Sequence, residues 1–220
     1  MYFPKGLDNF GVVLKGASVT RLPEVSGEFD HLFIVNNIDR NIDNKNSEWD
    51  VIAPNIEGKN VVHFVNRLPT ATLLKKHYEQ LKIKEVQFTK TELDFDLKGM
   101  KRIYESFGLN CNLLPPELLE YNKYFGPEYA NKHPNTGLLA IIYAAHILKP
   151  KKLYVVGLDF YQNDYLYRRP WQAPLEQQQA KMQRTDMVGH FVDVVKKNGN
   201  VNFKLITNAN VPKVKNLEIL

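Results

Sequence analysis

The sequence is poor in cysteine, since Cys111 is the only one among its 220 residues. A single cysteine cannot form an internal disulfide, and a chain of this length buries a core large enough to fold without covalent staples. These facts exclude the small disulfide-rich secreted scaffolds and make a reducing cytoplasm the simplest compartment. The length suits one domain over residues 1–220, or one domain with a small lid.

The sequence also lacks long apolar runs. No segment reaches the roughly 20 apolar residues that a membrane-spanning helix needs. The N-terminus shows no basic region followed by an apolar run of signal-peptide length. We therefore expect a soluble protein.

Clusters of basic residues are missing as well, although the formal net charge is +5, from 29 Lys and Arg against 24 Asp and Glu. The lysines are scattered, with no long basic run and no aromatic-basic RNA motif, which disfavours nucleic acid as a partner. A basic surface suits a phosphorylated small molecule, an acidic glycan or an anionic membrane face, so association with the inner membrane surface stays open. A homo-oligomer stays open too.

Short apolar runs alternate with helical patterns along the chain, and this alternation is typical of α/β proteins. The predicted strands are Phe10–Leu14, His31–Val35, Val61–Val65, Glu85–Phe88, Asn110–Leu114, Leu153–Val156 and Val201–Thr207. The predicted helices are Thr70–Leu81, Asp94–Phe107, Glu117–Phe125, Asn135–Leu148 and Glu176–Lys197, and Asn41–Lys59 is predicted to be a surface connection. The pattern predicts a Rossmann-like, mostly parallel sheet of about seven strands flanked by helices.

Polar residues follow three of these strands. Gly16 and Ser18 come after the first, Asn36 after the second and Asn66 after the third. Ligands of open parallel sheets bind beyond the carboxyl ends of the strands, so we expect these residues to share one crevice. Gly16 would let the backbone approach a phosphate, Ser18 would offer a hydroxyl, and the amides would bind a base or a sugar hydroxyl. Ordinary turns remain the alternative, because the first segment does not follow the GxGxxG pattern.

The most informative stretch runs from His133 to Tyr167. It begins with Pro134 and then Asn135-Thr136-Gly137, where Asn135 or Thr136 can cap the predicted helix and the helix N-terminus attracts phosphate. The predicted strand that follows ends at Gly157. Polar and aromatic residues come next, at the expected ligand position: Asp159, Tyr161, Asn163, Tyr165 and Tyr167.

This stretch resembles the bacterial, Campylobacter-type sialyltransferases. The match is carried by Gly157-Leu158-Asp159-Phe160-Tyr161-Gln162-Asn163, with Tyr167 as the second tyrosine. The Pro-Asn-Thr-Gly-Leu-Leu run is also similar to the second sialyl motif of animal sialyltransferases. The resemblance implies a CMP-activated sialic acid as ligand. It implies that Asn36 and Asn66 hold nucleotide and sugar, and that the helix opening at Asn135, Thr136 and Gly137 holds the charged part of the CMP-sugar.

The sequence departs from this family at two positions. The family's Gly-Asn-Gly-Pro-Ser-Leu motif matches at Gly16 and Ser18, but Lys15 replaces its asparagine; a lysine can meet a phosphate as a point charge. The second departure is Lys181, which stands where the bacterial enzymes have a histidine that acts as general base on the acceptor. A protonated lysine cannot accept a proton, so Lys181 would need a strongly lowered pKa to serve.

His190 does not replace this base on the sequence evidence. It lies nine residues after Lys181 on the same predicted helix, and nine residues are two and a half turns, so the two side chains would point to opposite sides. The family's Thr-Asp pair is matched by Thr185-Asp186.

The resemblance therefore implies a metal-independent glycosyltransferase that moves sialic acid or a related acidic sugar from CMP to a glycan acceptor. Tyr161 and Tyr167 would hydrogen-bond the departing phosphate in place of a metal. Two alternatives stay open: a catalytically impaired CMP-sugar-binding protein, which Lys181 favours, and a Rossmann-type module for another nucleotide.

Two other segments have residues of a kind that binds metals or anions. Asp94-Phe95-Asp96 has the Asp-x-Asp form of metal-dependent glycosyltransferases, but it is better interpreted as an exposed helix start, so we expect no metal cofactor. The segment from Tyr165 to Ala180 is predicted to be a mobile lid. Its Arg168-Arg169 pair suits a phosphate or a carboxylate.

Overall fold

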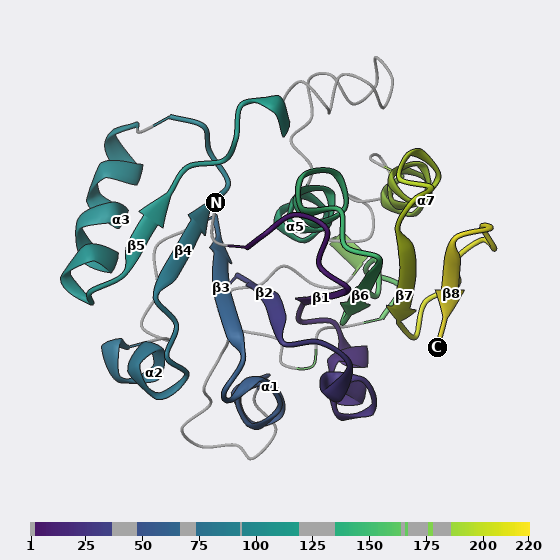
Figure 1. Cartoon of the computed structure of the whole chain (residues 1–220), viewed down its shortest axis with the longest axis horizontal. Helices are drawn as coiled ribbons and strands as arrows, with labels where there is room; N and C mark the ends of the chain where they lie inside the picture. Colours follow the sequence, from purple (N-terminus) through teal and green to yellow (C-terminus); the bar gives the residue numbers. More distant parts are fainter. Residues whose placement is uncertain are drawn as a thin grey trace.

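The computed structural model describes residues 3–36, 48–66, 74–92, 94–118, 135–163, 166, 176–177 and 186–220. Its centre is a sheet of eight parallel strands in the order β5-β4-β3-β2-β1-β6-β7-β8 (Figure 1). The strands are β1 (Asn9–Val13), β2 (His31–Val35), β3 (Asn60–Val65), β4 (Glu85–Phe88), β5 (Asn110–Asn112), β6 (Lys152–Val156), β7 (Asn202–Ile206) and β8 (Leu217–Ile219). The predicted Rossmann-like α/β fold is confirmed.

Helices cover both faces of the sheet. The described helical segments are η1 (Ala17–Glu24), η2 (Ser26–Glu28), α1 (Glu48–Ile56), α2 (Lys75–Gln80), α3 (Phe95–Ser106), α5 (Thr136–Ile142), η3 (Tyr143–Leu148) and α7 (Met187–Lys197). Figure 1 shows α5 and α7 on one face and α1 and α2 on the other. The buried side chains form two clusters that match these layers, one with α5, η3 and α7, the other with η1, α1, α2 and α3. None of the described helices is long and apolar enough to cross a membrane.

The inner strands are apolar on both faces, as parallel strands between two helical layers must be. Four of the five residues of β2 are buried, and one face is filled by aromatic rings. Phe33 meets Phe10 and Phe64 edge to face, with ring centroids 5.0 and 5.3 Å apart. Each such ring stabilises the fold by roughly 1.5–3 kcal/mol through burial alone.

The strand order reverses between β1 and β6. From β1 the chain builds β2 to β5 on one side, then crosses over and builds β6 to β8 on the other. The two central strands stay paired past their ends, because the Leu14 N–H donates to the Val156 carbonyl at 2.8 Å and the Gly16 N–H to the Gly157 carbonyl at 2.8 Å. Such a reversal opens the crevice in which open α/β sheets bind ligands.

The central helix begins as predicted. The Asn135 side-chain oxygen accepts the Leu138 N–H at 2.8 Å, so Asn135 rather than Thr136 is the cap. All seven residues of α5 are buried, and the helix widens into η3 before it ends at Lys149, whose φ is 52°.

Two predictions about helices were wrong. The expected surface connection Asn41–Lys59 contains helix α1 in its described part, since Ile52, Ala53 and Ile56 pack on the sheet despite Pro54 within the helix. The single helix Glu176–Lys197 was also wrong, because Asp186 has a φ of 37° and its carboxylate caps α7 by accepting the Gly189 N–H at 3.0 Å. The predicted helix is therefore interrupted at Asp186, and Lys181 lies outside the described residues.

The sheet has one strand more than expected. Strand β8 has three residues and pairs in parallel with β7 at the edge of the sheet. The helix predicted at Thr70–Leu81 is described over α2, and most of the helix predicted at Glu117–Phe125 lies outside the described residues.

Candidate functional site

The carboxyl ends of β1 and β6 are joined by the carboxylate of Asp159, which is 3% exposed. One oxygen accepts the Ser18 N–H at 2.8 Å, from the first turn of η1, which follows β1. The other accepts the Asn208 N–H at 3.0 Å, from the loop after β7, and lies 3.0 Å from the Thr207 hydroxyl, whose single hydrogen it shares with the nearer Leu158 carbonyl at 2.7 Å. Asp159 thus joins the carboxyl ends of three strands. Its proposed contact with a CMP-sugar stays a prediction, and in this structure protein donors bind both of its oxygens.

Gly16 and Ser18 are shaped by the same carboxylate. A Cβ on Gly16 would lie 2.6 Å from Asp159 Oδ2 and 2.7 Å from the Gly157 carbonyl oxygen, so a larger residue does not fit. The Ser18 side chain is buried, and its hydroxyl donates to the Ile206 carbonyl at 3.3 Å. The structure therefore gives both residues a role in packing the carboxyl ends of β1, β6 and β7 together.

A strained turn follows Asp159. Phe160 and Tyr161 have φ values of 50° and 58°, and the Gln162 N–H donates to the Asp159 carbonyl at 2.8 Å. Positive φ at both central residues is the signature of a type I′ turn, which usually contains Asn and Gly. For larger residues each left-handed conformation costs about 1–2 kcal/mol. Phe160 offsets part of this cost by packing in the core against Phe191, with ring centroids 5.4 Å apart.

Amide side chains hold this turn against the loop after β7. The Gln162 amide donates to the Asn210 carbonyl at 3.1 Å, and its oxygen accepts the Asn210 N–H at 2.8 Å. The Asn163 amide donates to the Asn208 carbonyl at 3.2 Å. Sequence reasoning missed these roles, which explain most of the Asp-Phe-Tyr-Gln-Asn pattern by folding alone. Tyr161 is half-buried in the middle of this run and packs against the core.

The two strand-end asparagines occupy neighbouring positions, after β2 and β3. Asn36 has a φ of 62°, and its N–H donates to the Phe64 carbonyl at 2.8 Å, which extends the β2–β3 pairing by one bond. The Asn36 side-chain oxygen is buried and has no hydrogen-bond partner among the described residues. A buried acceptor without a donor is costly, and residues 37–47, which follow Asn36 directly, lie outside the described residues. Asn66 is exposed at the end of β3.

Two buried titratable groups near this edge were not predicted. Glu48, at the start of α1, is 1% exposed, and burial raises the pKa of its carboxyl to about 7, although the charge of Lys15 acts in the opposite direction. Burial also lowers the pKa of His63 in β3 to about 4, and Lys15 contributes in the same direction. A glutamate in a first helical turn ordinarily lies in solvent, so the sequence carried no signal for Glu48.

Comparison with known proteins supports the fold. No protein-family model and no curated protein matches the chain. Among solved structures, the sialyltransferase CstII from Campylobacter jejuni in complex with cytidine-5'-monophosphate superposes with a TM-score of 0.51 at 13% identity, over 93% of this chain and 82% of that chain. This chain has a sialyltransferase-like fold. A mammalian sialyltransferase also matches, with a TM-score of 0.48 at 10% identity, over 90% of this chain and 68% of that chain.

The sialyltransferase-like helix opening is buried. Asn135 caps α5, and its amide nitrogen lies 3.3 Å from the Met187 sulfur. Thr136 and Gly137 are buried, and a Cβ on Gly137 would collide with the Leu14 side chain. Binding of a CMP-sugar by these residues stays a prediction.

Several predicted site residues lie outside the described residues. They are Tyr167 and Lys181, together with most of the predicted lid from Tyr165 to Ala180 and its Arg168-Arg169 pair. Their roles stay predictions from the sequence.

The Asp-x-Asp segment is a helix start, as expected. The Asp94 carboxylate caps α3 by accepting the Leu97 N–H at 2.8 Å, and it also pairs with Lys90. Asp96 lies in the first turn and is exposed. The described residues contain no group of three or more His, Cys, Asp or Glu that could hold a metal ion.

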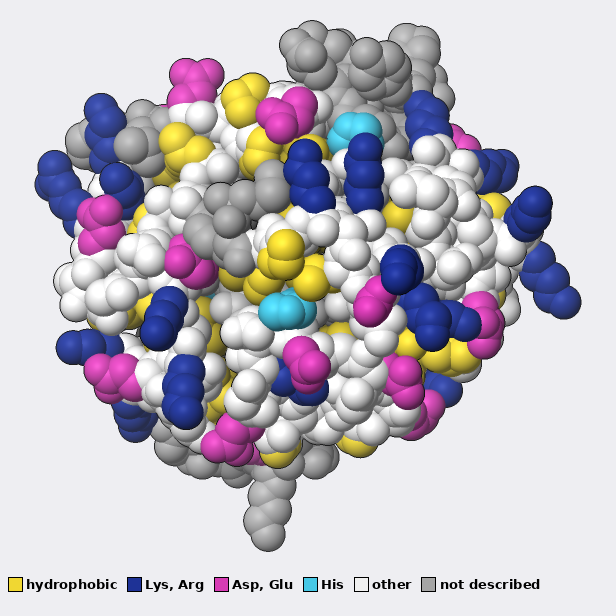
Figure 2. All heavy atoms as spheres, in the orientation of Figure 1, with side chains coloured by type: hydrophobic (Ala, Val, Ile, Leu, Met, Phe, Trp, Pro, Cys, Tyr) yellow, Lys and Arg dark blue, Asp and Glu magenta, His cyan; other side chains and the backbone are white. Residues whose placement is uncertain are grey.

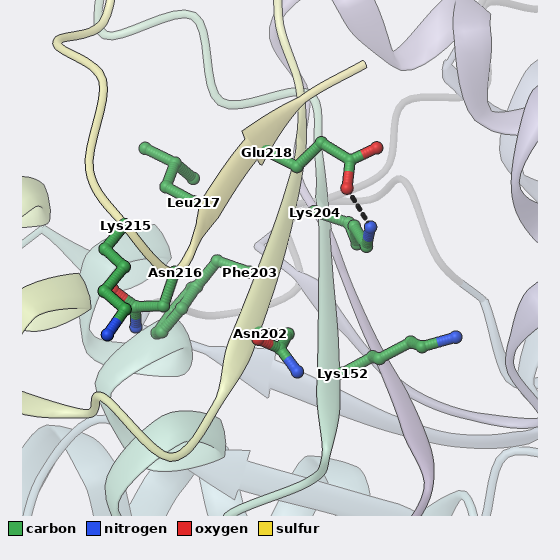
Figure 3. Close-up of a pocket in the computed structure, with 8 residues that line it drawn as sticks. All are labelled: Lys152, Asn202, Phe203, Lys204, Lys215, Asn216, Leu217 and Glu218. Atoms are coloured by element: carbon green, nitrogen blue, oxygen red, sulfur yellow. Dashed lines mark hydrogen bonds and ion pairs between the residues drawn. The ribbon is translucent and has the colours of Figure 1, made fainter.

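A shallow depression of about 150 Å³ lies at the opposite, amino edge of the sheet, where β6 and β7 begin with Lys152 and Asn202 (Figure 3). Its polar groups are largely used by the fold. Lys204 pairs with Glu218, and the Asn216 amide donates to three backbone carbonyls at 2.9 to 3.2 Å. On the face drawn in Figure 2, basic and acidic side chains are intermixed. We therefore place the candidate site at the carboxyl edge.

Proposed function

We propose that this chain is a glycosyltransferase that transfers sialic acid or a related acidic sugar from a CMP-activated donor to a glycan acceptor, without a metal. The observation that carries the proposal is the strained turn that holds Tyr161 at the carboxyl end of β6. This end lies at the point where the strand order reverses and ligands of such sheets bind. Backbone strain that persists at a ligand crevice is a mark of a functional position.

Strain at this edge stands out when the other strained residues are considered. Six described residues other than glycine have positive φ values. Three of them, Lys82, Lys149 and Asp186, lie at helix ends, where a left-handed residue stops or starts a helix. The remaining three all lie at the carboxyl edge of the sheet: Asn36, Phe160 and Tyr161. Helix termination does not explain their conformation.

The proposed chemistry is displacement at the anomeric carbon of the sugar. The bond between that carbon and the CMP phosphate oxygen breaks, a bond to the acceptor oxygen forms, and the acceptor proton passes to a base. Tyr161 would donate its phenolic hydrogen bond to the departing phosphate, where negative charge develops. Tyr167 would add a second donor, and Asn36 and Asn66 would bind the nucleotide and the sugar.

The test is a turnover assay with a CMP-sugar, in which release of CMP is measured with and without a glycan acceptor. Tyr161→Phe should lower kcat by roughly ten- to a thousandfold with a smaller effect on KM, because a contact made mainly in the transition state is lost. Tyr154→Phe is the matched control, since it makes the same change within β6 and removes only a 3.2 Å hydrogen bond to Glu28. Equal turnover of both variants would remove Tyr161 from the mechanism.

Two other outcomes would favour the alternative functions. Tight binding of CMP without any acceptor-dependent release would favour the impaired CMP-sugar-binding protein, as expected if Lys181 cannot act as a base. Equal melting shifts with CMP, AMP and GMP would favour a module for another nucleotide, because a site with amides at the base edge should distinguish the bases.

A further inference from the structure

His63 forms a buried hydrogen-bonded bridge to the backbone of Asn36. Its ring lies within the helix-covered side of β3 and is 1% exposed. Nε2 is 2.7 Å from the Asn36 carbonyl oxygen, and Nδ1 is 2.9 Å from the Tyr78 hydroxyl oxygen. Val61 and Val65, two residues away on either side, face the same apolar cluster, so a polar residue at this position is not what packing alone requires.

The chemistry of the partners fixes the protonation of this bridge. A carbonyl oxygen can only accept, so Nε2 carries the hydrogen. Nδ1 is then the acceptor, and the Tyr78 hydroxyl must donate to it. Burial keeps the ring neutral, because it lowers the pKa of His63 to about 4, and burial raises the pKa of Tyr78, which keeps its hydroxyl protonated. The bridge therefore runs in one direction, from Tyr78 through His63 to Asn36.

Both backbone polar groups of Asn36 are held by this arrangement. Its N–H donates to Phe64 and its carbonyl accepts from His63, while its φ is 62°. Asparagine tolerates the left-handed region better than most residues, but it does not require it. Fixing both peptide groups around the Asn36 Cα fixes the direction of its Cα–Cβ bond, from which the side-chain amide extends; the amide oxygen is buried without a partner among the described residues.

We propose that His63 is a positioning residue that, through its bond to the Asn36 carbonyl, holds Asn36 in the left-handed conformation that presents its amide to the pyrimidine of a bound CMP-sugar. The identity of the ligand in this inference rests on the proposed function, whereas the positioning of Asn36 by His63 does not. A buried polar bridge of three groups stabilises a fold only when each of its hydrogen bonds is made. This bridge ends on Asn36, at the carboxyl edge of the sheet where the ligand is proposed to bind.

The experiment compares CMP and AMP affinity by calorimetry in four proteins. His63→Leu removes the donor to Asn36 and should reduce the preference for CMP over AMP about tenfold, as expected for one lost buried hydrogen bond. Tyr78→Phe is the matched control: it breaks the same bridge but leaves the bond from Nε2 to Asn36, so the preference should be kept. His63→Gln retains an amide donor and should restore part of the preference.

Asn36→Gly distinguishes positioning from general destabilisation. Glycine adopts the left-handed backbone without a side chain, so this variant should lose the CMP preference by itself. Adding His63→Leu to it should then change the CMP affinity no further, because the proposed effect passes through the amide that is already gone. A further tenfold loss of CMP affinity in the double variant would overturn the proposal.

A measurement without ligand separates this inference from the proposed function. The three-bond coupling between the amide and α hydrogens of Asn36 reports φ in solution. The coupling should change in His63→Leu and stay as in the natural protein in Tyr78→Phe. An unchanged coupling in His63→Leu would refute positioning, whatever the ligand. Equal affinity of the natural protein for CMP and AMP would instead refute the proposed ligand and leave the coupling to decide the role of His63.

Discussion

Replacing Asp159 by asparagine tests how the carboxyl edge of the sheet is held together. The carboxylate accepts three protein donors, from Ser18, Thr207 and Asn208. The asparagine amide has only one oxygen. If that oxygen accepts from Thr207 and Asn208, the NH₂ group faces the Ser18 N–H, and two donors then oppose each other without an acceptor. A buried donor left without an acceptor costs about 1–3 kcal/mol, and the remaining bonds lose their charge assistance. We expect Asp159→Asn to destabilise the protein by roughly 2–4 kcal/mol.

Urea unfolding checks this value. The midpoint should fall without a change in slope, and the melting temperature should fall by about 4–16 °C for a domain of this size. Asp96→Asn is the matched control, because Asp96 is exposed in the first turn of α3 and its replacement should cost less than about 1 kcal/mol. If Asp159→Asn and Asp96→Asn were equally stable, the hydrogen bonds of Asp159 would not be what holds the three strand ends together.

Two further predictions concern the same edge. Gly16→Ala should destabilise the protein by several kcal/mol relative to Gly27→Ala. The new Cβ at position 16 would lie 2.6 Å from Asp159 Oδ2, whereas nothing lies within 4 Å of a Cβ at position 27. Equal melting temperatures of the two variants would show that the backbone around Gly16 can shift to accept a Cβ. Glu48→Gln should change the pH dependence of stability. The raised pKa means that the folded state binds the proton of Glu48 more tightly than the unfolded state does. The free energy of unfolding of the natural protein should therefore fall by roughly 3 kcal/mol as pH rises from 4.5 to about 7, and that of the variant should not. Urea midpoints measured across this pH range check the prediction, and the same pH dependence in both proteins would refute it.

The sheet was predictable because each central strand carries its own signal. Runs such as His31–Val35 and Glu85–Phe88 are buried on both faces, and their boundaries match the structure. Strand β8 has no such signal, since it depends on pairing with β7 at the sheet edge rather than on its own three residues. Helix α1 was hidden by Pro54, which argues against a helix locally although burial of Ile52 and Ile56 stabilises one.

The edge of the sheet at which the polar strand-end residues gather was predictable, but the contacts of these residues were not. Because the strands are parallel, the polar residues that follow them lie at one edge of the sheet, and ligand binding at that edge stays a prediction. The partners of Asp159 are 141 residues away at Ser18 and 48 residues away at Thr207, and no local pattern shows such contacts. A sequence pattern therefore cannot tell a residue that binds a ligand from one that binds another loop.

This distinction changes how the Asp-Phe-Tyr-Gln-Asn pattern should be interpreted. Asp159, Gln162 and Asn163 hold the loop after β7, and Phe160 fills the core, so a match at these positions is evidence for architecture before it is evidence for chemistry. Positive φ at Tyr161 and Asn36 is different, because it costs energy and stabilises no helix end. Bonds to neighbouring strands and loops hold both residues in this conformation, but neither residue starts or stops a helix. The proposed ligand contact is therefore tested more directly at Tyr161 and Asn36 than at the residues that hold the loop after β7.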